Sequence, residues 1–140
     1  MVTPDANDQR LISEYRQHGG GSVGGLPVLL LHTVGAKTGL DRVTPLVFWR
    51  VEDRRVAVLA SNRGAPADPY WFRNLVANPA TTVEIGTETW NVRAGIADAD
   101  VRKQLLPRIA QTTASVAAAL RRAPREIPLV ILELLSPVES

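Results

Sequence analysis

From Pro27 onward the chain is built from short apolar runs that are rich in β-branched or aromatic residues and separated by turn residues. The runs read PVLLLHT, VTPLVFWRV, RRVAVLAS, TTVEIG, ETWNVRAGIA and, near the C-terminus, IPLVILELL. Runs of this length and composition are typical of strands, and the sequences VEDRR and GTE between them indicate hairpin turns. The pattern therefore predicts about six mostly antiparallel strands.

An amphipathic pattern precedes these strands. Residues 5–18 are expected to form a short helix that ends at the glycine-rich sequence HGGGSVGG. Because glycine gives the backbone unusual freedom, this sequence indicates either a flexible link or a loop that a ligand approaches closely.

Three more helices are expected further along the chain. In ADPYWFRNLVANP, Asp68 is the expected N-cap and Pro69 the expected first helical residue. A helix over residues 98–110 contains Pro107, which is expected to kink or divide it. A last helix is expected over residues 114–122.

Many short strands with few helices favour a mainly β fold with flanking helices, of the α+β class, in which about six strands form a small barrel. The length of 140 residues is near the commonest size of a single domain. We expect one domain overall, with residues 1–25 as an N-terminal helix and glycine-rich link and residues 26–140 as the barrel.

Composition removes several classes of function. The chain has no cysteine, which excludes disulfides and thiolate chemistry, and its two histidines have no clustered carboxylates that would indicate a metal site. A net charge of +2 and the absence of interleaved aromatic residues argue against nucleic-acid binding. We expect a cytoplasmic protein without stable membrane insertion, because the N-terminus lacks an apolar signal core and the longest early apolar stretch is short.

The sequence GAKTGLDR, residues 35–42, combines the groups that an anion site requires. Gly35 and Gly39 allow backbone amides to point into one concavity, while Lys37 and Arg42 add positive charge and Thr38 adds a hydroxyl. A solvated hairpin turn explains the same residues, and residue types alone favour that simpler interpretation.

A second stretch, ASNRGAPADPYWFRNL, leaves a strand, passes through a glycine-containing loop and enters a helix. Loop amides just before a helix N-terminus can form a polar cradle. Trp71 and Phe72 follow with flat apolar surfaces, although the buried face of the helix accounts for at least one of them.

Together, LLLHTVGAKTGLDRVTPL, VLASNRGAPADPYWFRNLVANP and REIPLVILEL resemble the deazaflavin-dependent nitroreductase family. The resemblance covers roughly residues 26–134. It implies a split β-barrel related in fold to the FMN-binding split barrels, with residues 26–140 as the cofactor-binding domain and coenzyme F-420 as the cofactor.

The resemblance also implies roles for individual residues. Lys37, Thr38 and Arg42 correspond to the ligands of the coenzyme phosphate, and Trp71 and Phe72 would lie on the substrate side. Asn74 would help to fix the loop, and Arg63 is a candidate partner for the polyglutamate tail. The expected coenzyme-binding residues are Gly35, Lys37, Thr38, Gly39, Arg42, Pro45, Ser61, Asn62, Arg63, Gly64, Ala65, Trp71 and Asn74.

The implied reaction is hydride transfer from the reduced coenzyme to an electron-poor quinone, enone or nitro compound, with no certain catalytic side chain. The family often has a basic residue at the position of Ala36, a tyrosine at that of Phe72, a lysine at that of Val76, and pocket tyrosines near the last strand. Because no aromatic residue follows Trp90, coenzyme binding is better supported than nitroreductase activity.

Two alternatives remain open at this point. An FMN-binding reductase would need a similar phosphate site, and a non-catalytic protein could bind the coenzyme or another ligand. The resemblance also leaves a homodimer possible.

Overall fold

The computed structural model describes residues 6–23 and 25–138, so Asp5 of the predicted first helix lies outside the described residues. Its helices are α1 (Ala6–His18), α2 (Tyr70–Ala77), α3 (Ala99–Thr112) and α4 (Ala114–Arg122), with a single 3-10 turn, η1 (Asn62–Gly64). Its strands are β1 (Gly21–Val23), β2 (Leu26–Val34), β3 (Asp41–Val47), β4 (Trp49–Glu52), β5 (Arg55–Leu59), β6 (Ala80–Ile85), β7 (Glu88–Ile96) and β8 (Leu129–Pro137). This composition confirms the predicted mainly β, α+β class.

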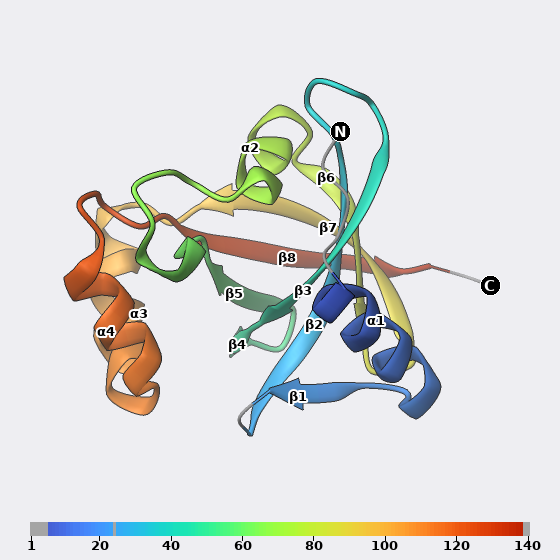
Figure 1. The fold of residues 1–140 in the computed structure, drawn as a ribbon, viewed down its shortest axis with the longest axis horizontal. Helices are drawn as coiled ribbons and strands as arrows, with labels where there is room; N and C mark the ends of the chain where they lie inside the picture. The colour runs from blue at the N-terminus through green and yellow to red at the C-terminus, as the bar shows by residue number, and fades with distance from the viewer. Residues whose placement is uncertain (1–5, 24, 139–140) are drawn as a thin grey trace.

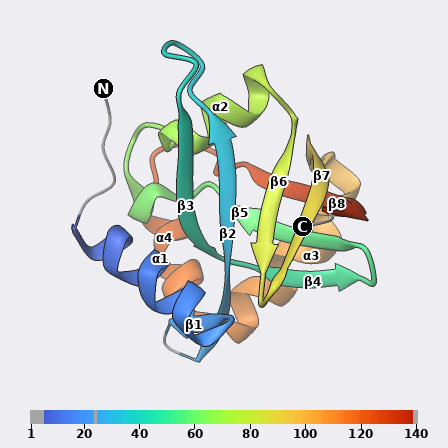
Figure 2. The same cartoon turned by 90° about the vertical axis from the view of Figure 1, so that its right-hand side faces the viewer.

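The strands form one curled sheet in the order β1-β2-β6-β7-β8-β5-β4, with β3 also paired to β2, and all pairs are antiparallel. The predicted run VTPLVFWRV is divided at Phe48, so that β3 pairs with β2 while β4 pairs with β5. The chain around Phe48 therefore links the two ends of the sheet, and Figures 1 and 2 show the resulting half-barrel. This division, together with β1, makes eight strands rather than about six.

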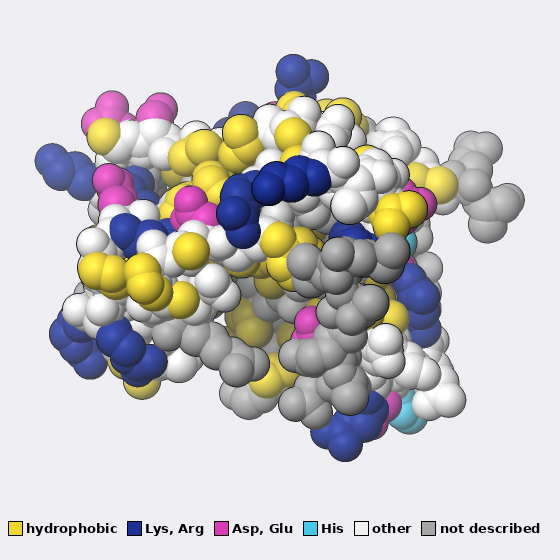
Figure 3. Space-filling model, turned by 45° about the horizontal axis from the view of Figure 1, so that its top comes forward, with side chains coloured by type: hydrophobic (Ala, Val, Ile, Leu, Met, Phe, Trp, Pro, Cys, Tyr) yellow, Lys and Arg dark blue, Asp and Glu magenta, His cyan; other side chains and the backbone are white. Residues whose placement is uncertain are grey.

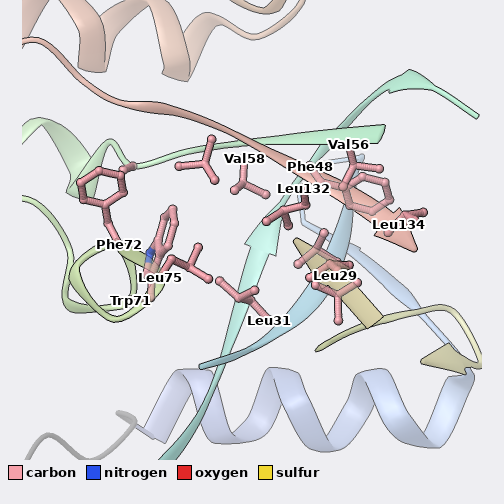
Figure 4. Packing of buried hydrophobic residues seen from close by; sticks show 14 residues of the cluster. Leu29, Leu31, Phe48, Val56, Val58, Trp71, Phe72, Leu75, Leu132 and Leu134 are labelled. Carbon is pink, nitrogen blue, oxygen red and sulfur yellow. The ribbon is translucent and has the colours of Figure 1, made fainter. Parts of the chain in front are cut away.

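The barrel interior is filled by side chains that alternate with outward-facing ones along each strand. On β2, Leu29 and Leu31 belong to the interior cluster, whereas Val28 and Leu30 pack with Tyr15 of α1. Figure 4 shows the interior cluster closed at one end by residues of α2. All four of these β2 residues are buried, which explains why the run PVLLLHT is apolar without alternation.

A polar cluster also ties α1 to the sheet. Glu84 on β6 accepts two hydrogen bonds from Arg16, at 3.2 and 2.8 Å, and its Oε2 lies 2.6 Å from Nε2 of His32. Burial alone would raise the pKa of Glu84, but the hydrogen bonds from Arg16 and His32 outweigh burial and lower the pKa. His32 is thus a hydrogen-bonded structural residue.

The structure corrects two local predictions about the helices. Pro107 does not divide helix α3, because this residue faces solvent and the carbonyl that loses its partner can bind water; a kink at Pro107 stays a prediction. Helix α2 has Pro69 rather than Asp68 at its N-cap position, and the carboxylate of Asp68 instead pairs with Arg125 at 2.6 Å. Part of the expected glycine link is ordered as well, since Gly21–Val23 pairs with β2.

Candidate functional site

The β2–β3 hairpin projects past the sheet beside α2 (Figures 1 and 2). A pocket of about 280 Å³ is lined by residues of the hairpin and of that helix. Figure 3 shows basic side chains next to exposed apolar ones on the face that carries α2. The lining residues come from only these two segments: Gly35, Ala36, Lys37, Thr38, Arg42, Tyr70, Arg73 and Asn74. Five of the residues predicted for coenzyme binding are thereby brought together around one cavity.

The hairpin tip is a compact turn held by its own backbone. The amide of Gly35 donates to the carbonyl of Leu40 and the amide of Gly39 donates to the carbonyl of Gly35, both at 2.8 Å. Gly39 has a φ of 69°, which favours glycine. A Cβ on Gly35 would lie 2.4 Å from Oγ1 of Thr38, so that hydroxyl occupies the space that the missing side chain leaves.

Asn74 of α2 fixes the hairpin from the side. Its Oδ1 accepts a hydrogen bond from the Ala36 amide at 2.9 Å, and its Nδ2 donates to Oγ1 of Thr33 at 3.1 Å. Asn74 is 6% exposed and Thr33 is 2% exposed, so both bonds lie out of contact with most of the solvent. Because buried polar groups are costly to leave unpaired, this contact sets the distance between hairpin and helix.

Positive charge gathers in the pocket without an acidic partner. Lys37, Arg42 and Arg73 line it, and none of the ion pairs among the described residues includes them. The backbone amides of Lys37 and Thr38 likewise donate to no described group. Uncompensated cations beside free amides are the arrangement that binds a phosphate or carboxylate.

A pair of hydroxyl groups lies at the inner side of the pocket. The hydroxyl of Tyr70, the first residue of α2, is 3.3 Å from Oγ1 of Thr44 on β3. Thr44 is 7% exposed, whereas Tyr70 lines the cavity. The pair can therefore offer a hydrogen bond to a bound molecule from a fixed position.

The pocket also contains residues that the sequence interpretation missed. Tyr70, Arg73 and Asn74 have the i, i+3 and i+4 spacing that places side chains on one face of a helix. This polar stripe in PYWFRNL is the signal that could have identified Tyr70 and Arg73. The neighbouring Trp71 and Phe72 form a stronger apolar pattern on the same helix, which masks it.

The second predicted loop, residues 61–65, does not line this pocket and is organised by another side chain. Arg125, which precedes β8, donates to the carbonyls of Ala65 at 3.1 Å and Ala60 at 3.0 Å and pairs with Asp68. Local sequence carries no signal for this contact, because its partners lie 57 to 65 positions earlier in the chain.

The remaining predicted site residues lie elsewhere. Trp71 and Phe72 are 4% and 8% exposed and meet edge to face in the interior cluster, as Figure 4 shows, so their substrate contact stays a prediction. Pro45 lies on the edge strand β3, opposite Leu30 of β2. It is therefore on the same face of β3 as Val43 and Val47, two positions before and after it. The side chain of Arg63 lies outside the described part of the structure.

Comparison with known proteins identifies the family to which the chain is similar. The sequence model of the F420H(2)-dependent quinone reductase family matches residues 8–134. A Mycobacterium tuberculosis protein, provisionally named an F420H(2)-dependent quinone reductase, is 38% identical over 108 residues, which are 76% of this chain and 89% of that protein.

Two solved structures share the fold. One, described as a domain-swapped dimer, has a TM-score of 0.70 and 28% identity, covering 89% of this chain and 96% of the other. An F420-H2 dependent reductase has a TM-score of 0.68 and 30% identity, covering 76% of this chain and 94% of its own. Among the described helices of the present chain, none is long and apolar enough to cross a membrane.

Proposed function

The chain belongs to the F420H(2)-dependent quinone reductase family, and from this premise we propose that it transfers a hydride from reduced coenzyme F-420 to a quinone. It is an oxidoreductase that uses this deazaflavin as its cofactor. We assign coenzyme binding to the pocket between the hairpin and α2. The main support is the cluster of Lys37, Arg42 and Arg73, which have no acidic partner among the described residues.

The residues of the pocket fit the phosphate of the coenzyme. Lys37, Arg42 and Arg73 supply charge, and the free amides of Lys37 and Thr38 supply directed donors. The Thr38 hydroxyl, which accepts from the Leu40 amide at 3.3 Å, can donate its own proton to a phosphate oxygen. Gly35 and Gly39 keep the turn open to the ligand, and Asn74 holds it against α2.

The deazaflavin ring is assigned to the loop of Ser61, Asn62, Gly64 and Ala65, with Trp71 behind it and Pro45 shaping the strand below. Support comes from the resemblance and from the position of this loop directly before α2. Arg63 keeps its assignment as a candidate partner of the acidic tail. The wider organisation is part of the same proposal: residues 26–140 form the cofactor-binding domain, and residues 1–25 form the N-terminal helix and link.

The bound coenzyme supplies the hydride, and the protein supplies binding, orientation and shielding from water. A quinone that accepts one hydride and one proton becomes a hydroquinone. The proton can come from water or from the Tyr70 hydroxyl, which lines the pocket with Thr44 behind it. Thus the reaction requires neither a side-chain nucleophile nor a metal ligand set.

Homodimer formation is proposed as well. It is supported by the similar structure described as a domain-swapped dimer, at 28% identity. A measured mass in solution distinguishes a dimer from a monomer.

The decisive experiment is a fluorescence titration of the unmodified protein with coenzyme F-420 and, in parallel, with FMN. We expect saturable binding of F-420 and much weaker binding of FMN. Oxidation of the reduced coenzyme is then followed with quinone, enone and nitro acceptors. Turnover with a quinone supports the reductase, binding without turnover of any acceptor indicates a carrier, and preferential FMN binding would overturn the coenzyme assignment.

A further inference from the structure

Arg125 has every N–H donor of its guanidinium directed at the segment from Ala60 to Asp68 or at its own backbone neighbour. Nε donates to Ala65 at 3.1 Å, and Nη2 donates to Ala60 at 3.0 Å and Ala67 at 3.2 Å. Nη1 pairs with the carboxylate of Asp68 at 2.6 Å. Longer approaches of 3.5 Å reach the carbonyls of Ser61 and Glu126.

These contacts distinguish Arg125 from a ligand of the coenzyme. Its side chain is 16% exposed, and its charge is neutralised by Asp68. A guanidinium has five donors in a rigid fork, and all of them are engaged here. Arg125 therefore holds the backbone of residues 60–68 and has no free donor for a bound anion, unlike Lys37 and Arg73 of the pocket.

The backbone that Arg125 holds has an uncommon shape. Asn62 has a φ of 46° and Gly64 a φ of 80°, both in the left-handed region, and the side chain of Asn62 donates to the carbonyl of Ala67 at 2.9 Å. A non-glycine residue in this region costs free energy and persists only where its surroundings impose it. With the carbonyls of Ala60 and Ala65 turned toward the guanidinium, the amides of Ser61 and Asn62 donate to no described group.

We propose that Arg125 is a positioning residue for the coenzyme: it fixes the Ser61–Ala65 loop in the conformation that presents free amides to the deazaflavin ring. This inference rests on the proposed function, because it assigns that loop to the ring. The contact crosses from the connection before β8 to the connection before α2, so it also couples the last strand of the barrel to the coenzyme loop.

Arg102 provides a matched control. It is a similarly buried arginine, 20% exposed, that donates to the carbonyl of Ile127 and pairs with Glu126 at 3.2 Å. It thus contacts the same connection before β8, and neither its hydrogen bond nor its ion pair among the described residues reaches residues 60–68. Arg125→Gln removes a largely buried charge from this connection, and Arg102→Gln removes one from helix α3 that contacts it. Only the first substitution is expected to release the loop.

The test measures the coenzyme dissociation constant of both variants and the hydrogen exchange of peptides covering residues 60–68 without coenzyme. For Arg125→Gln we expect weaker binding by about tenfold, equivalent to about 1.4 kcal/mol, and faster exchange in that segment. Arg102→Gln should change the affinity by less than about twofold, and its exchange should rise outside the segment. Asp68→Asn, which leaves the guanidinium on the carbonyls, should show a smaller change in the same direction and serves if Arg125→Gln does not fold.

The outcomes separate the inference from the proposed function. Unchanged affinity and unchanged exchange in Arg125→Gln, in a chain whose unmodified form binds the coenzyme, overturn the inference alone. Equal losses of affinity in Arg125→Gln and Arg102→Gln overturn it as well, since they indicate general destabilisation. An unmodified protein that does not bind coenzyme F-420 overturns both the proposed function and the coenzyme role of Arg125.

Discussion

Replacing Asn74 by alanine tests whether the α2–hairpin contact serves ligand binding or only stability. The side-chain amide of Asn74 bonds to the Thr33 hydroxyl, 41 positions earlier in the sequence, and to the Ala36 backbone amide, 38 positions earlier. Alanine removes both bonds without introducing a larger side chain. Helix propensity favours alanine over asparagine, so α2 itself should persist.

The expected loss can be worked out from these two bonds. A typical hydrogen bond contributes about 0.5–1.5 kcal/mol net, and a buried donor left unpaired costs about 1–3 kcal/mol. In Asn74→Ala the Ala36 amide is the donor left unpaired, whereas the Thr33 hydroxyl oxygen only loses a donor and can still donate its own proton. We therefore expect the free energy of unfolding to fall by about 2 kcal/mol. The unfolding entropy of a 140-residue domain is about 0.3 kcal/mol per kelvin, so the melting temperature should fall by about 7 °C.

Affinity should fall for a separate reason. The Ala36 bond holds the hairpin in its binding-competent position, and losing about 1.4 kcal/mol of this preference lowers the ratio of competent to displaced hairpin about tenfold. The apparent dissociation constant for coenzyme F-420 should then rise, with about tenfold as the upper limit.

The assay combines thermal unfolding with the fluorescence titration. Asn91→Ala is the control, because it removes one exposed hydrogen bond of 3.2 Å to Ser136 on the far part of the sheet. A lowered melting temperature with an unchanged dissociation constant for Asn74→Ala would refute the argument that this residue sets the geometry of the pocket.

Three further predictions concern the hairpin and the α1 clasp, which is the polar cluster of Arg16, His32 and Glu84. Lys37→Ala should weaken coenzyme F-420 binding at least tenfold with the melting temperature unchanged, because the side chain lines the pocket without a described acidic partner; an unchanged dissociation constant contradicts this role. Gly35→Ala should weaken binding because its Cβ would meet Oγ1 of Thr38 at 2.4 Å, and Thr38→Gly in the same chain should relieve the clash; circular dichroism checks that the fold remains. Glu84 has a lowered pKa despite its burial, chiefly through Arg16, so its contribution to stability is present above pH 4.5, the ordinary carboxyl pKa, and is lost as the pH falls through the lowered one. The stability difference between the unmodified chain and Glu84→Gln should therefore shrink from pH 7 to pH 3, and a constant difference would show that the clasp is not ionic.

The strands were predictable where their signals were local. Apolar runs and turn residues correctly located β2, β5, β6, β7 and β8. Burial of one or both faces of a strand gives its sequence an alternating or continuous apolar pattern, which can be recognised directly. Strand β1 was missed because its three residues are stabilised by pairing with β2 rather than by their own composition. The break at Phe48 was missed for a similar reason: both halves of the run are apolar, and only their different partners divide them.

The cap of α2 shows the same limit at a single residue. Asp68 precedes a proline at the start of a helix, which is a strong local signal for an N-cap. Its carboxylate instead meets Arg125, 57 residues later. Both bonds would be charge-assisted on the side of the carboxylate, but arginine adds a full opposite charge that a backbone amide lacks, so the tertiary contact takes precedence over the local one.

Each of the two loops predicted to bind the coenzyme is held by a side chain from another part of the chain. Asn74 of α2 fixes the β2–β3 hairpin through the Ala36 amide. Arg125, which precedes β8, fixes the Ser61–Ala65 loop through backbone carbonyls. Most of the pocket residues were visible in the sequence as glycines, cations and hydroxyls, because their chemistry is local, although Tyr70 and Arg73 were missed. Of the two residues that hold the loops, the family resemblance indicated Asn74. Arg125 was not indicated, because its contacts arise only when the barrel brings distant segments together. The motifs of this chain therefore indicate what it can bind, while we expect its affinity to depend also on the long-range contacts of Asn74 and Arg125, which a local motif does not encode.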